Sequence, residues 1–517
     1  MRGAAGLPSA YAHRSAVAIT TGPGYAGSEP CARHLPGATP GPGLMSAARM
    51  QEAAWHWTDA PHRWLATVAK PQSREKLGFL RPVGWVVALE LIVVALFNGL
   101  PFALGNNASL ALSLAGSSAV HLSSRPSKRD ILATAVMAVA LRALYSWFIG
   151  PIGNYFGSAW ISWGSFLGFA SLLTLGVRAL TARGILRKTA SHDFWVASAL
   201  LYSWIIAIFA MDFTPRTMPF TLDRFLYAFD GSLGFEPSFA AGRMLAGLPL
   251  LKSLTFMQYE ALMLGLAMVY AWQRMRPIQG SPKVLPVSVS MMIAGYFLYH
   301  LYPAAGPAYG FGSLFPQQPP EIFQVVLVPI PLDAAARNAM PSLHMGIALL
   351  IWWHSRGSHW VGRLAAGLFL LATAFSTMAT GEHYLIDLVV AFPFAMAIQA
   401  AWATSIPFRA RARYLPMVTG ISMTFAWFAL LRFGIHFLFL SPVLPWLLVA
   451  STVVYSLLTE IQLTAAGHKM YQAAPSARRH DGKFGRLGPP VTQPPDDRDS
   501  AARPRRWRPG RRCVSPP

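Results

Sequence analysis

Long apolar segments recur along most of the chain, separated by short polar segments that hold most of the charged residues. A helix that crosses the hydrocarbon core of a bilayer needs about 20 apolar residues. By this criterion the pattern predicts up to twelve transmembrane helices, of which 108–122 is weakly apolar and 341–355 is short. The expected spans are 84–104, 108–122, 131–149, 159–177, 194–213, 256–273, 283–302, 341–355, 361–379, 383–403, 416–438 and 443–461. The predicted fold is therefore all-α: a polytopic membrane protein with about 10–12 transmembrane helices.

The composition agrees with this prediction and excludes other classes. Hydrophobic residues make up 54% of the 517 residues and charged residues only 12%, against about 25% in an average soluble domain. The net charge of +22 would suit nucleic-acid binding, but the basic residues occur in short clusters between apolar segments and in the C-terminal tail. We therefore expect membrane lipids, and no nucleic acid, as partners. The two cysteines, Cys31 and Cys513, exclude a disulfide framework and a thiolate metal site.

The same pattern divides the chain into five regions. Residues 1–75 are rich in Gly, Pro and Ala and are expected to be disordered. The basic, Pro-rich tail 464–517 is also expected to be disordered and to touch anionic lipid. Between them lie helices of unknown role at 84–180, a central bundle at 194–403 and a C-terminal hairpin at 416–461.

The charges of the loops predict the orientation in the membrane. Lys and Arg are concentrated in alternate connections, such as "RPSKRD", "RMRPIQGSPK" and "RARAR", whereas "GPIGNYFGS" and "ATGEH" on the opposite side have none. Cytoplasmic loops are the ones that carry the excess of Lys and Arg. We therefore expect an integral protein of the plasma membrane, or of the bacterial inner membrane, with both termini in the cytoplasm. The segments 213–255, 304–344 and 379–387 then lie on the extracytoplasmic side.

A histidine and an aspartate stand together at the start of one predicted span, in "GEHYLIDLVV". His383 and Asp387 are four residues apart and so share one helical face. A carboxylate there can accept a hydrogen bond from one imidazole nitrogen and raise the basicity of the other. Gly381 allows close backbone approach, and the open N–H groups of a helix N-terminus favour an anion. This combination is typical of a nucleophile or base directed at a phosphate.

A second polar group opens another predicted span, in "RNAMPSLHMG". If His383 attacks a phosphoryl group, a second residue must protonate the departing oxygen, and His344 suits that role near neutral pH. Ser342 and Arg337 could bind the phosphate oxygens. "PSLH" alone is also compatible with an ordinary capped helix start. Two such ionisable motifs at the same membrane face favour a functional site, because ionisable residues in membrane helices are costly.

"PSLH", followed about forty residues later by "HYLID", resembles the second and third motifs of the type-2 phosphatidic acid phosphatase (PAP2) superfamily. More narrowly, with "DRFLYAFDGSLGFEPSF" and "YHLYPAAGPAYGF" upstream, it resembles the inositolphosphotransferase branch, which includes the fungal inositol phosphorylceramide synthases. The resemblance covers roughly 195–405. It implies a six-helix catalytic bundle within 194–403 and a ping-pong reaction through a phosphohistidine on His383. Asp387 would orient that histidine, His344 would act as acid and then base, and no metal or other cofactor would take part.

The chain departs from the superfamily pattern at its cationic residues. The third motif usually has Ser-Arg before the histidine, and here the two positions are Ser376 and Thr377. The first motif, a lysine six residues ahead of Arg-Pro, is not found at the expected place. The resemblance therefore leaves the phosphate charge to other residues. The outer-face arginines available are Arg337, Arg224, Arg243 and Arg216, and we expect Arg337 first. The expected substrate-binding groups are Arg337, Ser342, Ser376 and Arg224. The inositolphosphotransferase branch characteristically lacks the two arginine motifs, so the departures favour it.

Two other functions remain open from the sequence. A lipid phosphate phosphatase, acting on phosphatidic acid or a polyprenyl phosphate, would use the same residues with water as the acceptor. A transporter would place ionisable residues near the middle of its spans and show repeats between its halves. The outer segment 214–255 mixes aromatic and charged residues and is predicted to be an amphipathic interfacial element over the site. The donor lipid, the acceptor and the oligomeric state are not determined by the sequence.

Overall fold

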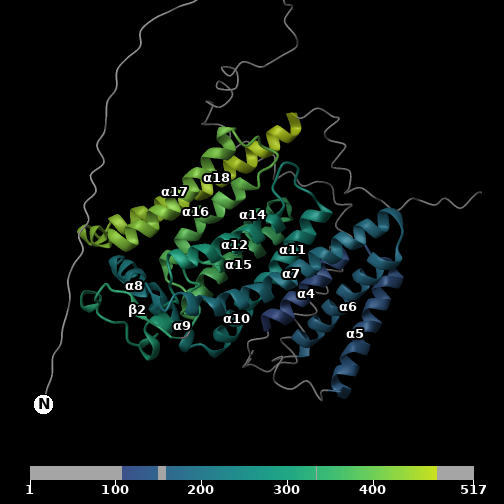
Figure 1. Cartoon of the computed structure of the whole chain (residues 1–517), viewed down its shortest axis with the longest axis horizontal. Coiled ribbons are helices and arrows are strands. Elements are labelled where there is room, and N and C mark those ends of the chain that lie inside the picture. The colour runs from purple at the N-terminus through teal and green to yellow at the C-terminus, as the bar shows by residue number, and fades with distance from the viewer. Residues whose placement is uncertain (1–107, 149–158, 334, 474–517) are drawn as a thin grey trace, which may run out of the picture. The chain divides into compact units, whose positions relative to one another are not determined.

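The computed structural model describes residues 108–148, 159–333 and 335–473, which are mostly helical (Figure 1). The α-helices are α4 (Ala108–Ser123), α5 (Lys128–Phe148), α6 (Ala159–Thr181), α7 (Gly184–Thr217), α8 (Asp223–Ser232), α9 (Pro237–Ala246), α10 (Pro249–Glu260), α11 (Leu262–Met275), α12 (Val284–Leu301), α13 (Pro307–Gly310), α14 (Leu343–His354), α15 (Trp360–Ala379), α16 (Leu385–Ala401), α17 (Arg411–Phe433) and α18 (Leu444–Ala473). Short 3₁₀ helices are η3 (Gly312–Leu314), η4 (Ile322–Gln324), η5 (Ser355–Gly357) and η6 (Ile435–Leu440). Two short strands, β1 (Phe220–Thr221) and β2 (Ile330–Pro331), pair antiparallel. The predicted all-α fold is confirmed.

The helices follow the predicted apolar segments, with three differences. The predicted span 194–213 is part of the longer helix α7. The predicted span 256–273 is broken at Ala261, where α10 and α11 meet at 53°. Helix α18 continues to Ala473 and so includes the first ten residues that were predicted to belong to the tail. The predicted span 84–104 and the predicted disordered region 1–75 lie outside the described residues, as does the tail from 474 onward.

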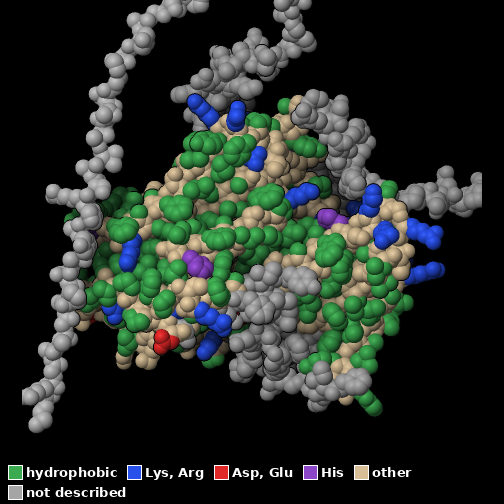
Figure 2. Space-filling view, viewed as in Figure 1, with side chains coloured by type: hydrophobic (Ala, Val, Ile, Leu, Met, Phe, Trp, Pro, Cys, Tyr) green, Lys and Arg blue, Asp and Glu red, His purple; other side chains and the backbone are tan. Residues whose placement is uncertain are grey.

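Several of these helices can cross a membrane. By length and composition five described helices qualify, and the bent pair α10–α11 makes six if it counts as one span. The five are Trp163–Thr181, Val284–Leu301, Trp360–Ala379, Arg411–Phe433 and Leu444–Ala473. Three further predicted spans, α4, α14 and α16, form helices of 16, 12 and 17 residues, shorter than the roughly 20 of a straight crossing. Figure 2 shows apolar side chains over much of one face of the molecule, as expected for a polytopic membrane protein.

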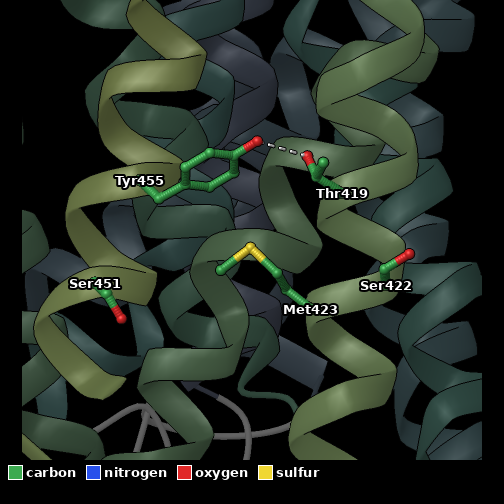
Figure 3. Close-up of a pocket in the computed structure, with 5 residues that line it drawn as sticks. All are labelled: Thr419, Ser422, Met423, Ser451 and Tyr455. Atoms are coloured by element: carbon green, nitrogen blue, oxygen red, sulfur yellow. Dashed lines mark hydrogen bonds between the residues drawn. The ribbon is translucent and has the colours of Figure 1, made fainter. Parts of the chain in front are cut away.

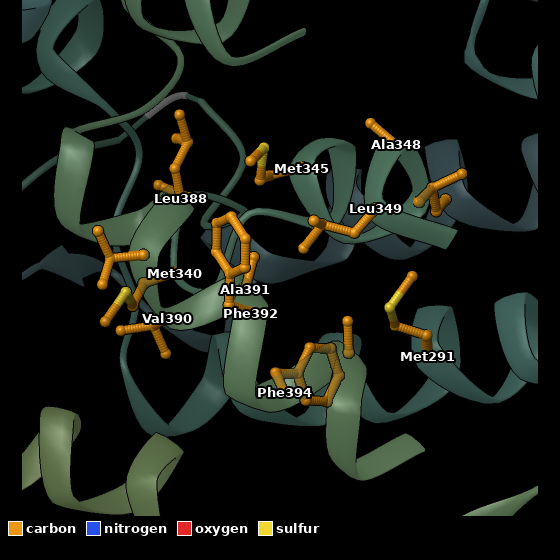
Figure 4. Packing of buried hydrophobic residues seen from close by; sticks show 14 of the residues in the cluster. Met291, Met340, Met345, Ala348, Leu349, Leu388, Val390, Ala391, Phe392 and Phe394 are labelled. Carbon is orange, nitrogen blue, oxygen red and sulfur yellow. The ribbon is translucent and has the colours of Figure 1, made fainter. Parts of the chain in front are cut away.

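The core is built around α14 and α16, which are apolar on nearly every face. A helix that is apolar all round is favoured at the centre of a bundle. Accordingly, α14 packs against α11, α12, α15 and α16. Met291, Met345, Leu349, Phe392 and Phe394 meet between these helices (Figure 4). The starts of α14 and α16 are thereby held side by side, and both histidine motifs stand at these starts.

The loops gather at two ends according to their predicted side. At one end, the predicted cytoplasmic loop at Gly280 touches α18, since a Cβ on Gly280 would lie 2.3 Å from the carbonyl oxygen of Gly467. Ser405, from another predicted cytoplasmic loop, donates to the Gly280 carbonyl at 2.7 Å. At the opposite end, Trp446 donates to the carbonyl of Leu233 at 3.3 Å. Loops predicted to share a side therefore contact one another.

A buried ion pair attaches α18 to the bundle. Arg356 of η5 pairs with Glu460 of α18, and the two side chains are 12% and 1% exposed. Thr464 also donates to Glu460 at 2.8 Å. Within this apolar surrounding, loss of one partner leaves the other charge uncompensated.

We expect Glu460→Ala to reduce the free energy of unfolding by about 3–5 kcal/mol, because Arg356 would stay buried without its partner. Denaturant unfolding in detergent measures this. The double variant Arg356→Met/Glu460→Met is the control, and it should recover most of the loss since no charge is left buried. Equal destabilisation by the single and the double change would contradict this account.

Candidate active site

The loop between α15 and α16 presents His383. The N–H groups of Glu382 and His383 both donate to the carbonyl of Thr377 at 3.1 Å, and Ser238 of α9 donates to the carbonyl of His383 at 2.9 Å. Gly381 takes a positive φ of 79°, and a Cβ there would meet Ala308 at 2.6 Å. A glycine is therefore required for this turn, which directs the histidine back into the bundle.

The bonds of the His383 ring assign its two nitrogens. Nδ1 lies 3.0 Å from the carbonyl oxygen of Ala339 and 3.5 Å from Oδ2 of Asp387. A carbonyl can only accept, so Nδ1 carries the hydrogen and Nε2 carries the lone pair. Ser342 Oγ lies 3.2 Å from Nε2 and donates to it. The structure thus brings His383, Asp387 and Ser342 together, with Ala339 as the nearest acceptor for Nδ1.

Asp387 has a second contact that the sequence does not predict. Its Oδ2 accepts the N–H of Tyr384 at 2.8 Å, which satisfies a donor at the start of α16. The Asp387 carboxylate therefore lies beside the His383 ring and also caps the N-terminus of α16, the helix that follows His383.

Burial determines the charge of His383. Its side chain is 1% exposed, and burial lowers its pKa to about 3, while the bond to the Ala339 carbonyl acts in the opposite direction. The imidazole is therefore neutral near pH 7, which is the form that has a lone pair on Nε2 and can attack an electrophile.

His344 approaches His383 from the first turn of α14. The centroids of the two rings are 5.9 Å apart at 65°, and Tyr259 stacks on the other ring, that of His344, at 4.1 Å and 24°. The aromatic stack limits the orientations open to His344. The two predicted histidines, 39 positions apart in the sequence, thus face one site between α14 and α16.

The two predicted arginines are engaged elsewhere. Arg337 is fully buried, and its Nε donates to the carbonyl of Met218 at 3.0 Å. Its two terminal nitrogens donate to the carbonyls of Ala335 and Leu332. The expected role of Arg337 in binding phosphate is therefore not supported, because its guanidinium satisfies backbone acceptors. Arg224 donates to the carbonyl of Val326 at 3.2 Å and fastens α8 to a neighbouring loop.

Ser376 is connected to the histidines indirectly, through Gln258. It donates to Oε1 of Gln258 at 2.8 Å, and Gln258 also donates to Thr373 at 2.6 Å. Gln258 immediately precedes Tyr259, so Ser376 supports the helix turn that stacks on His344.

Glu382 lies at the mouth of the site beside Tyr309. The Tyr309 hydroxyl donates to Glu382 Oε1 at 3.2 Å. Burial raises the pKa of Glu382 to about 7, against the effect of that hydrogen bond. The charge of Glu382, together with burial, in turn raises the pKa of Tyr309 to about 12. Glu382 therefore titrates near neutral pH.

A cavity elsewhere in the described part of the chain is lined by none of these residues. This cavity, of about 350 Å³, lies between α17 and α18 and is lined by Thr419, Ser422, Met423, Ser451 and Tyr455, with Tyr455 donating to Thr419 at 3.2 Å (Figure 3). It has no acid, base or cation for phosphate chemistry. Among the residues that the structure describes, no three His, Cys, Asp or Glu side chains come together as a metal site requires.

The comparison with protein families coincides with this site. Residues 224–401 match the PAP2 superfamily. The matched segment is about a third of the chain and contains both histidines, Asp387 and the helices α9 to α16 around them. PAP2 proteins are helical membrane proteins that are generally phosphatases or phosphotransferases, so an enzyme acting on lipid phosphates is supported at this level. Comparison with curated proteins and with solved structures found no match.

We expect the titration of Glu382 to be visible in stability. Its pKa is raised on folding, from 4.5 to about 7. The ionised form is therefore disfavoured in the folded state, and stability that is present below about pH 4.5 is lost as the pH rises to about 7. Glu382→Gln should remove roughly 3 kcal/mol of this loss.

Melting temperatures in detergent at pH 5 and pH 8 measure the effect. The difference between Glu382→Gln and the unchanged protein should grow in favour of the variant at pH 8. The same difference at both pH values would show that Glu382 does not titrate in this range.

Proposed function

We propose that the chain is an integral membrane phosphotransferase that acts on lipid phosphates or phosphoinositides through a phosphohistidine on His383. The observation that carries this proposal is the His383 ring, whose Nδ1–H is bonded to Ala339 and whose Nε2 lone pair faces Ser342 beside His344. Only this tautomer leaves Nε2 available for attack on phosphorus.

The reaction divides into two displacements at phosphorus. In the first, Nε2 of His383 bonds to phosphorus, the bond from phosphorus to the leaving oxygen breaks, and His344 in its imidazolium form gives that oxygen a proton. The bound phosphate favours the imidazolium because opposite charges attract at short range. In the second, neutral His344 takes the proton of an acceptor hydroxyl, whose oxygen attacks phosphorus as the bond to Nε2 breaks.

Ser342 has a defined place in this scheme. Its hydroxyl donates to Nε2 of His383 in the resting site. When Nε2 bonds to phosphorus, the same hydroxyl can turn to a phosphate oxygen, since a hydroxyl rotor can donate in more than one direction. Asp387, 3.5 Å from Nδ1, stabilises the positive charge that develops on the ring.

The resemblance favours transfer to an alcohol over hydrolysis, because the inositolphosphotransferase branch characteristically lacks the arginine motifs that are missing here. Where the superfamily motif has an arginine, Thr377 donates to the carbonyl of Thr373 inside α15. The same feature supports the inositolphosphotransferase branch as the closer resemblance. The loops around the site are those with few basic residues, which supports an active site on the extracytoplasmic face with both termini in the cytoplasm.

We expect His383→Ala to lower the rate of phosphoryl transfer by about 10³-fold or more, since the nucleophile is lost. The assay uses membranes with labelled phosphatidylinositol or phosphatidic acid, in the presence and absence of an acceptor alcohol. The unchanged protein should also retain acid-labile label, and the variant none.

His436→Ala is the matched control, because His436 is an exposed histidine in η6, at the outer end of the predicted span 416–438. It should keep full activity. Activity that survives His383→Ala would rule out the phosphohistidine, and release of free phosphate without any acceptor would identify a phosphatase instead.

A further inference from the structure

Helix α8 carries two buried aspartates that the proposed reaction does not use. Asp223 is 0% and Asp230 is 1% exposed. They are seven residues apart, at the two ends of one face of the helix. Neither forms an ion pair within the described part of the chain, although an unpaired buried carboxylate is costly unless it is hydrogen-bonded. Burial raises the pKa of both groups; a hydrogen bond from the Thr221 side chain and then backbone N–H groups oppose this at Asp223, and the N–H of Leu385 opposes it at Asp230.

Asp230 holds the start of α16. Its Oδ2 accepts the N–H of Leu385 at 3.2 Å. Leu385 is the first residue of α16, so this N–H has no acceptor within the helix. It is also two residues from both His383 and Asp387. The carboxylate of α8 therefore fixes the position of the helix end from which both active-site residues project.

Asp223 holds the other side of the histidine through the loop that follows α12. Its carboxylate accepts the N–H of Gly306 at 2.7 Å and that of Ala305 at 3.1 Å. The preceding carbonyl, that of Ala304, accepts the N–H of Ala339 at 2.9 Å. The carbonyl of Ala339 is in turn the acceptor for Nδ1 of His383.

The same loop touches the histidine loop directly. Gly306 has a φ of 96°, and a Cβ there would lie 2.4 Å from the carbonyl oxygen of Glu382. The N–H of Ala308 donates to the carbonyl of Gly381 at 2.9 Å. The segment that Asp223 fixes thus contacts both Ala339, whose carbonyl accepts from His383, and the backbone just before His383.

From these contacts we propose that Asp223 and Asp230 are positioning residues that hold His383 in its Nδ1-protonated tautomer, with Nε2 toward the substrate. The proposal rests on the proposed function of His383 as the nucleophile. The contacts described above reach the ring through backbone groups, so their expected effect is on its orientation and not on the binding of the lipid. Their loss lowers the fraction of His383 that can attack and thereby slows the chemical step.

Steady-state kinetics of the full chain in membranes test this proposal. Asp223→Ala and Asp230→Ala should each reduce kcat by about 10- to 100-fold and leave KM within about threefold. Asp223→Asn and Asp230→Asn should recover most of the rate, because the amide oxygen can still accept from a backbone N–H. Glu321→Ala, at an exposed carboxylate of a neighbouring loop, should change neither constant. An alanine variant with unchanged kcat, or with a change in KM alone, would overturn the proposal.

A variant that does not fold as alanine is replaced by the glutamate variant at the same position. Asp230→Glu or Asp223→Glu keeps the carboxylate but moves it by one methylene. A tenfold lower kcat in the folded glutamate variant supports positioning, and an unchanged kcat overturns it.

The tautomer of His383 provides a readout that needs no activity. Ring nitrogen shifts of ¹⁵N-histidine, assigned with His383→Ala, should show hydrogen on Nδ1 in the unchanged protein. In Asp223→Ala a fraction should shift to the form with hydrogen on Nε2. A tautomer that stays the same in both aspartate variants contradicts the proposal. If His383→Ala instead keeps its activity, the proposed function fails while the tautomer measurement still decides the positioning role.

Discussion

The hydrogen bond from Nδ1 of His383 to the carbonyl of Ala339 connects the architecture of this protein to its chemistry. The bond selects the tautomer and so determines which ring nitrogen faces the site. It also joins two segments that are far apart in the sequence, because Ala339 leads into α14 and His383 leads into α16. His344 lies five residues after Ala339, so the contact that orients one imidazole also places the other. A shift between α14 and α16 would change both at once.

The packing below the site explains how this bond is maintained. Helices α14 and α16 are almost wholly apolar, and the side chains between them leave little freedom for one to slide along the other. Apart from His354 and Gln399, which pair at 3.0 Å near the far ends of the two helices, the polar side chains of α14 and α16 lie at the helix starts, beside the loops above them. There each buried N–H must find an acceptor, and Asp223, Asp230 and Asp387 supply three of them. The apolar core fixes α14 and α16 against each other, and the carboxylates fix the backbone of the helix starts and loops around the histidines.

Much of the fold is predictable because long apolar segments have few alternatives to helices in a membrane protein. The histidine pair is predictable because each histidine stands in a polar motif at the mouth of such a segment. The bend at Ala261 is not predictable, because α10 and α11 together have the hydropathy of one span. The stacking of Tyr259, next to this bend, on His344 is therefore not predictable either.

The contacts of Arg337 show which part of the site the sequence does not predict. Charge and nearness to "PSLH" predict a phosphate-binding role for Arg337, but sequence does not reveal which carbonyls a fold leaves without donors. In this fold the carbonyls of Met218, Ala335 and Leu332 take up the guanidinium. Ala339 could not have been selected either, because it acts through a main-chain atom that every residue possesses. The spacing of Asp223 and Asp230 was present in "DRFLYAFD", yet only the structure connects the two residues to α16 and to the loop after α12.

Helix α18 lies outside the segment that matches the superfamily, yet it is attached to the bundle along its whole length. Trp446 reaches Leu233 near one end, Glu460 pairs with Arg356, and Gly467 touches Gly280 near the other end. The bundle that these contacts hold together is therefore longer than the segment that matches the family. A boundary drawn at residue 401 would expose the inner faces of α16 and leave Arg356 without its partner, whereas one drawn after residue 473 would keep every one of these contacts.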